Sequence, residues 1–391
     1  MITTLWISLF IVFYTFIGYG ILLYIIIKIK RAVKGRPVLP VVSDDLLPTC
    51  TLVVAAYNEE HFIAEKIANS LQLNYPAGKL RLVFVTDGSS DATADIISRH
   101  PQIQLLHKSE RAGKIAAVHR AMTYVDTDVV VFTDANTFLN SEAITRICRH
   151  YADETVGAVA GEKRVQIDEN ADASAAGEGF YWKYESALKK WDSELYSVVG
   201  AAGELFSVRR ELYQDVPADT VLDDFMISML IAAKGYRIIY EPEAYALETA
   251  SENVSEELKR KIRIAAGGIQ SILRLQVLLL PFKYPILSFQ YISHRVLRWT
   301  VTPFFLILAL LTNFAVAFAG KGVCYQLLFA AQVLFYLLAF LGFIMEKRQL
   351  RIKVLFIPYY FCVMNYAVLA GIIRYFTKKQ SSVWEKVQRK T

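Results

Sequence analysis

Long uncharged stretches set off both ends of the chain from a polar middle. Residues 1–27, 299–320, 322–345 and 354–373 contain no Asp, Glu, Lys or Arg. A helix that crosses a bilayer needs roughly 20 such residues, so each stretch is predicted to be a transmembrane helix. A cleaved signal peptide fits the first stretch poorly, because it is too long and ends without a small-residue cleavage site.

The residues that flank these stretches predict the topology in part. Residues 28–36 are rich in Lys and Arg, and the positive-inside rule then places the N-terminus outside and the middle region in the cytoplasm. Residues 346–353 and the tail after residue 373 are both basic, so a single crossing by the last stretch cannot satisfy the rule at both of its ends. Pro358 offers one solution, by breaking that stretch into a re-entrant or interfacial piece.

The middle region alternates short β-rich runs with helical patterns. Its fold class is predicted to be α/β, with a mostly parallel sheet covered by helices on both faces and flanked by transmembrane α-helices. In such sheets, ligands bind beyond the carboxyl ends of the strands. The predicted strands are 50–55, 80–85, 103–107 and 128–132, and the predicted helices are 58–72, 89–98 (with Ser89 or Ser90 as N-cap) and 113–124.

Acidic residues follow these strands where a ligand would bind. Asp87 closes the second strand, and Asp134 and Asn136 are spaced so that two side-chain oxygens can reach one hard cation, which grips a diphosphate. Asp223 and Asp224 are adjacent carboxylates, which can perturb each other's pKa as suits a general base. The structural alternative for all of them is turn formation or helix capping, which Asp and Asn favour.

Charge and composition narrow the class of protein. The net charge is +6 and 54% of the residues are hydrophobic. The basic residues cluster beside the uncharged stretches, which favours anionic lipid headgroups as partners and argues against nucleic acid. The four cysteines and six histidines show no metal-ligand spacing. A membrane transporter with a regulatory nucleotide-binding domain is disfavoured, because no GxxxxGK[ST] sequence is present.

The ordered set YNEE, DGSSDAT, GK, FTDAN, GAAGELFSVRR, LDDF and RKIR resembles the membrane-bound family 2 glycosyltransferases. This family includes cellulose, hyaluronan and poly-N-acetylglucosamine synthases and shorter bacterial relatives. The resemblance covers about residues 48–300 and implies a GT-A fold, an inverting reaction at the anomeric carbon and a divalent metal cofactor (Mg²⁺ or Mn²⁺). The order of the set is specific, whereas none of its members is specific alone.

The resemblance also implies a role for each matching residue. Asp224 would be the catalytic base, with Asp223 beside it, and Gly203 and Glu204 would lie at the acceptor. Ile264 stands where the family's (Q/R)xxRW motif has its tryptophan, so long-chain processivity is not expected. The donor would be bound by Tyr57, Glu59, Asp87, Lys114, Asp134, Arg260 and Arg263, and the metal by Asp134 and Asn136.

The implied function is transfer of a sugar from a nucleotide sugar, expected to be UDP-linked, to a growing polysaccharide, with formation of a β-glycosidic bond. The alternative is transfer of a single sugar to a polyprenyl-linked or other lipid acceptor. Expected partners are the donor, a lipid or saccharide acceptor, the membrane and subunits for export. The expected location is the plasma membrane, as a multi-pass protein with a cytoplasmic catalytic domain.

These expectations divide the chain into six segments. They are a transmembrane helix at 1–30, a linker at 31–48, a GT-A domain at 49–268, interfacial helices at 269–298, transmembrane helices at 299–376 and a basic tail at 377–391.

Overall fold

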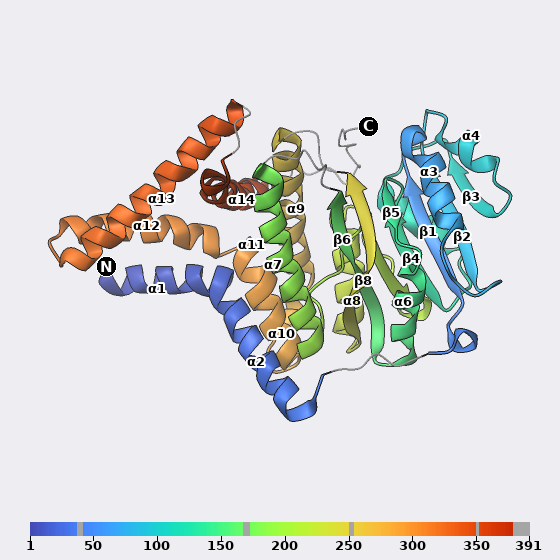
Figure 1. Ribbon diagram of the computed structural model, residues 1–391, viewed down its shortest axis with the longest axis horizontal. Helices are drawn as coiled ribbons and strands as arrows, with labels where there is room; N and C mark the ends of the chain where they lie inside the picture. Colours follow the sequence, from blue (N-terminus) through green and yellow to red (C-terminus); the bar gives the residue numbers. More distant parts are fainter. Residues whose placement is uncertain (37–41, 167–172, 250–253, 349–351, 378–391) are drawn as a thin grey trace. The chain divides into compact units, whose positions relative to one another are not determined.

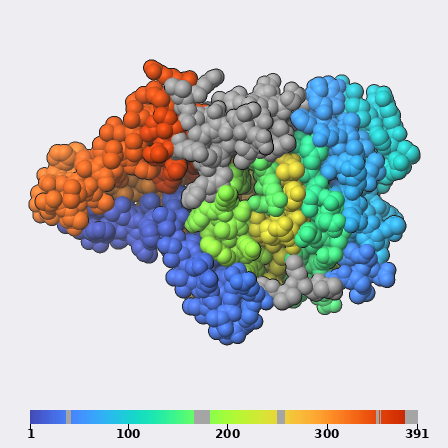
Figure 2. Space-filling model, viewed as in Figure 1, coloured from blue at the N-terminus to red at the C-terminus, as the bar shows by residue number. Residues whose placement is uncertain are grey.

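The computed structural model describes residues 1–36, 42–166, 173–249, 254–348 and 352–377. The chain forms two compact units (Figure 1; Figure 2 gives the same view as a surface). We call residues 1–29, 167–188 and 254–380 the membrane unit, because it contains the long apolar helices, and residues 30–166, 189–253 and 381–391 the catalytic unit, after the role that the sequence resemblance predicts for it. Helices α2 (Tyr19–Lys34) and α7 (Ala173–Leu195) begin in the membrane unit and end in the catalytic unit.

The catalytic unit is built on one sheet of eight strands in the order β3-β2-β1-β4-β7-β6-β8-β5. The pairs β1–β2, β1–β4, β2–β3 and β6–β8 are parallel, whereas β4–β7, β6–β7 and β5–β8 are antiparallel. The strands are β1 (Cys50–Ala56), β2 (Leu80–Asp87), β3 (Ile103–Lys108), β4 (Val129–Asp134), β5 (Thr137–Leu139), β6 (Val156–Gln166), β7 (Leu205–Arg209) and β8 (Arg237–Thr249).

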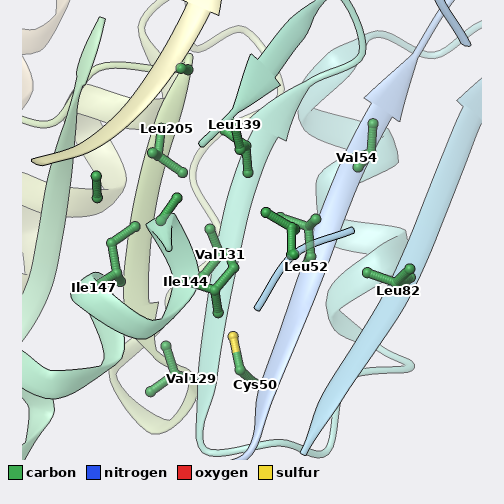
Figure 3. Packing of buried hydrophobic residues seen from close by; sticks show 14 of the residues in the cluster. Cys50, Leu52, Val54, Leu82, Val129, Val131, Leu139, Ile144, Ile147 and Leu205 are labelled. Atoms are coloured by element: carbon green, nitrogen blue, oxygen red, sulfur yellow. The ribbon is translucent and has the colours of Figure 1, made fainter. Parts of the chain in front are cut away.

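Helices cover both faces of this sheet. Successive side chains of a strand point to opposite faces, so a strand can pack against helices on both sides. On β1, Leu52 and Val54 join a buried cluster with Ile67, Ile144 and other residues of α3 and α6, as Figure 3 shows in part. Val53 and Ala55 face the α5 side instead. The predicted fold class is therefore confirmed. The covering helices are α3 (Glu60–Leu71), α4 (Thr93–Ser98), α5 (Lys114–Met122), α6 (Ala143–Arg149) and α8 (Asp223–Ala233).

One helix start differs from the sequence prediction. Helix α4 begins at Thr93, with Ala92 at its N-cap position, so the prediction that Ser89 or Ser90 caps it is wrong. Both serines bind the turn after β1 instead. The Asn58 N–H donates to Ser89 Oγ (3.1 Å), and the Ser90 N–H donates to Asn58 Oδ1 (2.8 Å). The Ser89 hydroxyl oxygen thus accepts from Asn58 rather than from a backbone N–H of α4.

The membrane unit contains the long apolar helices. Three helices in the described residues are long and apolar enough to cross a membrane, namely 2–34, 323–347 and 354–376. A fourth candidate, Pro285–Trp299 followed by Thr302–Phe318, is bent by 60°. The helices of the membrane unit are α1 (Ile2–Phe13), the first parts of α2 and α7, α9 (Val254–Arg274), α10 (Pro285–Tyr291), α11 (Leu297–Trp299), α12 (Thr302–Phe318), α13 (Val323–Lys347) and α14 (Lys353–Phe376).

Two expectations for this unit were wrong in detail. Pro358 does not break the last helix, since α14 continues through it; as the sixth residue of the helix, it removes a single i to i−4 hydrogen bond. No new helix begins at residue 269, because α9 runs unbroken through Gly267 and Gly268. A Cβ at Gly268 would lie 2.6 Å from the Trp299 ring, so this glycine allows close packing and does not end the helix.

Candidate active site

The carboxyl end of β2 organises the loop that precedes α5. Asp87 is 5% exposed, and its carboxylate accepts the N–H groups of Ala112 (3.1 Å) and Gly113 (2.6 Å). Gly88 has a φ of +69°, and a Cβ there would lie 2.7 Å from the Cβ of Arg111. The Asp-Gly pair therefore makes a turn and also fixes the neighbouring loop, so the turn and the functional interpretation of Asp87 are compatible.

A cationic side chain lies over the aromatic ring of the first motif. The Arg111 guanidinium carbon is 3.9 Å from the centroid of the half-buried Tyr57 ring. This pair presents a flat, positively charged platform beside the strand ends. Arg111 is not among the residues predicted from the sequence, because the motif in this part of the chain is the following pair, Gly113-Lys114.

The end of β4 carries the carboxylate proposed as a metal ligand. Asp134 Oδ1 accepts a hydrogen bond from Lys114 Nζ at 2.7 Å, and both side chains are mostly shielded from solvent. Burial alone lowers the pKa of Lys114, but the carboxylates of Asp134, Asp223 and Asp224 outweigh burial and raise it. The lysine is therefore a fixed cation at neutral pH.

The two adjacent carboxylates lie in the first turn of α8. Burial, followed by repulsion from Asp223, raises the pKa of the half-buried Asp224 to about 7, although Lys114 pulls it down. A Cβ built on Gly203 would lie 3.3 Å from Asp224 Oδ2 and 3.6 Å from Lys114 Nζ. The glycine therefore brings the backbone before β7 close to both charged groups.

Lys114, Gly203 and Asp223 line one small hollow on the α5 side of the sheet. The rest of its lining is Thr133 and the apolar residues Val53, Ala55, Val118, Phe132 and Phe206. Asp224 lies beside Asp223 in the first turn of α8. A carboxyl of perturbed pKa next to a fixed cation is typical of an active site.

Two of the predicted residues make structural contacts. Glu204 is 8% exposed, and its Oε1 accepts from Lys163 Nζ at 2.7 Å; Lys163 also pairs with the buried Glu248. Glu59 is 6% exposed, and its N–H donates to Thr93 Oγ1 at 2.8 Å. Their assignment to acceptor and donor stays a prediction.

The residues at the end of β4 fit a divalent cation shared with a substrate. Among the described residues, no group of three or more His, Cys, Asp or Glu converges on one point. Asp134 Oδ2 has no partner in the described part of the chain, and the Asn136 amide lies two residues further on. Magnesium is commonly held by one or two carboxylates plus substrate phosphates, so this small oxygen set fits an ion that a diphosphate would complete.

The remaining predicted donor residues lie on α9 of the membrane unit. Arg260 pairs with Glu257 at 3.7 Å, and Arg263 follows three residues later. Their predicted role rests on the sequence motif alone.

Comparisons with known proteins agree with this geometry. Residues 51–216 match the sequence model described as glycosyl transferase family 2. A poly-beta-1,6-N-acetyl-D-glucosamine synthase from Staphylococcus aureus (strain COL) is 27% identical over 245 residues, which are 60% of this chain and 58% of that protein. An N-acetylglucosaminyltransferase from Neorhizobium galegae is 23% identical over 261 residues, covering 62% of this chain and 60% of that one. The match thus spans less than two thirds of the length of these relatives.

A solved structure is similar over a longer part of the chain. A mannosyltransferase from Pyrobaculum calidifontis, in complex with GDP-Man and Mn²⁺, superposes with a TM-score of 0.71 and 25% identity. The match covers 96% of this chain and 99% of that one.

Proposed function

We propose that this chain is a family 2 glycosyltransferase, which moves a sugar from a nucleotide-sugar donor to a growing polysaccharide at a membrane, with inversion at the anomeric carbon. The observation that carries the proposal is the convergence of Asp224 and Lys114 on Gly203 beside the hollow. A carboxylate and a cation at one backbone turn are the two groups that such a transfer needs.

In the proposed reaction, Asp224 accepts the proton of the acceptor hydroxyl. The hydroxyl oxygen then bonds to the anomeric carbon while the bond from that carbon to the donor phosphate breaks, and the nucleoside diphosphate leaves. Because its pKa is about 7, a large share of Asp224 is ionised at neutral pH and is still basic enough to take the proton. An α-linked donor would give a β-glycoside.

Asp134 and Asn136 would hold a divalent cation. When bound, such an ion offsets the charge that builds on the departing diphosphate. Lys114 contributes a second positive charge at the same place, fixed by its bond to Asp134. Tyr57 and Arg111 offer a platform on which a nucleobase can stack.

The donor nucleotide is a separate question. The resemblance favours a UDP-sugar, whereas the mannosyltransferase named above holds GDP-Man. The donor panel in any assay therefore needs both nucleotide classes.

One observation favours the alternative of a single transfer to a lipid acceptor. Ile264 supplies no aromatic face on which an acceptor sugar of a growing chain could stack. Both candidates share the same chemistry at Asp224 and differ in the acceptor.

The apolar helices support a membrane location. We propose a plasma-membrane protein whose catalytic unit faces the cytoplasm, because the basic residues 28–36 follow the first apolar helix. Subunits for export are proposed only for the polysaccharide reaction.

The test uses the full chain in lipid nanodiscs with a panel of UDP- and GDP-sugars. We expect one donor to release nucleoside diphosphate in a manner that depends on Asp224 and on added acceptor. If Asp224→Asn released it as fast as the wild type, the proposed base would be wrong. Product size then distinguishes a polysaccharide from a single addition.

A further inference from the structure

A buried lysine lies behind the turn that carries Asp134. Lys66, on the second turn of α3, is 0% exposed. Its Nζ donates to the Thr137 carbonyl at 2.6 Å and to Thr133 Oγ1 at 3.2 Å. These two acceptors flank Asp134 on either side in the chain.

Burial of a lysine side chain at such a position costs free energy. Lys and Arg are almost never fully buried unless they are paired, because an ammonium loses its hydration there. Burial lowers the pKa of Lys66 to about 7, while the nearby Asp134 opposes this shift. No carboxylate bonds Lys66 in the described residues, and its hydrogen bonds go only to the turn.

The same contacts reach the turn before β7. Thr133 Oγ1 donates to the Glu204 carbonyl at 2.9 Å and lies 3.0 Å from Thr137 Oγ1. Thr137 Oγ1 in turn donates to the Asp134 carbonyl at 3.0 Å. Residue 204 follows Gly203, which approaches Asp224. A single ammonium thus supports both the Asp134 turn and, through Thr133, the turn beside Asp224.

We propose that Lys66 is a positioning residue, which sets the geometry of the Asp134–Asn136 turn for a divalent cation and links it to the Gly203–Glu204 turn. The inference rests on the proposed role of Asp134 as a metal ligand. Lys66 contacts neither metal nor substrate; it acts through Thr133 and Thr137. Outer partners of metal ligands commonly contribute about 10- to 100-fold to metal affinity.

The alternative is that Lys66 only stabilises the fold. The two roles predict different results, because general destabilisation lowers the melting temperature without selectively weakening a metal site. Ile67→Val is a matched control: Ile67 is the next residue of α3, is 1% exposed, and contributes an apolar side chain to the buried cluster.

The test measures Mn²⁺ binding directly by electron paramagnetic resonance of the free ion, with the full chain in detergent and a nucleoside diphosphate present. Wild type, Lys66→Met, Thr133→Val, the double variant, Ile67→Val and Asp134→Ala are compared, with melting temperatures for each. Methionine keeps the length of the side chain and removes the charge, while valine keeps the shape of threonine.

We expect Lys66→Met to raise the Mn²⁺ dissociation constant by about 10-fold or more, with Ile67→Val unchanged. The Lys66 and Thr133 effects should not add, since both variants break the same chain of bonds. If Lys66→Met does not fold, Thr133→Val carries the same expectation at smaller size. Wild-type Mn²⁺ affinity in a folded Lys66→Met or Thr133→Val would overturn the inference. Wild-type affinity in Asp134→Ala would instead overturn the proposed metal site itself.

Discussion

Replacing Asp224 by Asn should separate activity from stability. The substitution keeps the size of the side chain but removes its ability to accept a proton. We expect the rate to fall by roughly 10²- to 10⁴-fold, the usual contribution of a general base. Donor binding should be largely retained, because the proposed donor contacts of Tyr57, Lys114 and Asp134 lie on other elements.

The same substitution should stabilise the protein above neutral pH. The folded-state pKa of Asp224 is about 7, higher than its ordinary value of 3.8, so folding favours the protonated form. Stability therefore falls as pH rises from about 4 to about 7, because the native carboxyl must ionise at a cost. At about 1.4 kcal/mol per pKa unit this cost is roughly 4 kcal/mol, and screening of a half-buried group reduces it to about 2 kcal/mol. The asparagine side chain never ionises, so the Asp224→Asn variant does not incur this cost.

Two measurements check this reasoning. Nucleoside diphosphate release should give a wild-type pH–rate profile that rises through about pH 7, since the base must be deprotonated. Thermal unfolding should show Asp224→Asn gaining more stability over wild type at pH 8 than at pH 5. A profile that is flat between pH 6 and 8, or an equal gain at both pH values, would refute the environment assigned to Asp224. A greater rate loss in Asp223→Asn would show that the two roles are reversed.

Three further predictions concern the metal, the glycine turn and the product. Asp134→Ala and excess EDTA should each abolish turnover in folded protein, and undiminished transfer in chelator would contradict the metal site. Gly203→Ala should slow transfer by roughly 10-fold or more through displacement of Asp224, since small misplacements of reacting groups are costly; an unchanged rate would show that the turn has room to adjust. The isolated chain should make short products or single additions, as Ile264 suggests, and polymer of high molecular weight on size-exclusion analysis would contradict this.

The sequence predicts the first half of the sheet well. Strands 50–55, 80–85, 103–107 and 128–132 each appear within two residues of their predicted ends. The signal is strongest for β1 and β4, which are mostly apolar and buried on both faces, whereas the edge strand β3 fully buries only Ile103. The sequence does not predict the antiparallel insertion of β7 between β4 and β6. Strand β7 is five residues long, and its pairing depends on contacts with residues far away in the chain.

The residues of the candidate site are likewise predicted from the sequence only in part. Asp87, Lys114, Asp134 and Asp224 lie next to predicted strand ends or helix starts, so their position in the chain indicates them. Arg111 and Lys66 have no such mark in the sequence. Lys66 in particular lies in an ordinary helical pattern, and a lysine there predicts an exposed side chain. Only the fold shows that its helix faces the Asp134 turn.

The charges of the site indicate different roles for its two lysines, Lys114 and Lys66. Lys114 bonds Asp134 and also attracts Asp224, so it keeps the pKa of Asp224 near 7 against the repulsion from Asp223 and Glu204. Lys66 bonds the Thr137 carbonyl and the Thr133 hydroxyl, and the nearby Asp134 favours its charged form. Lys114 therefore acts directly on the charge of the proposed base, whereas Lys66 acts on the placement of the Asp134 turn. A loss of charge at Lys114 should change the pH at which the base works.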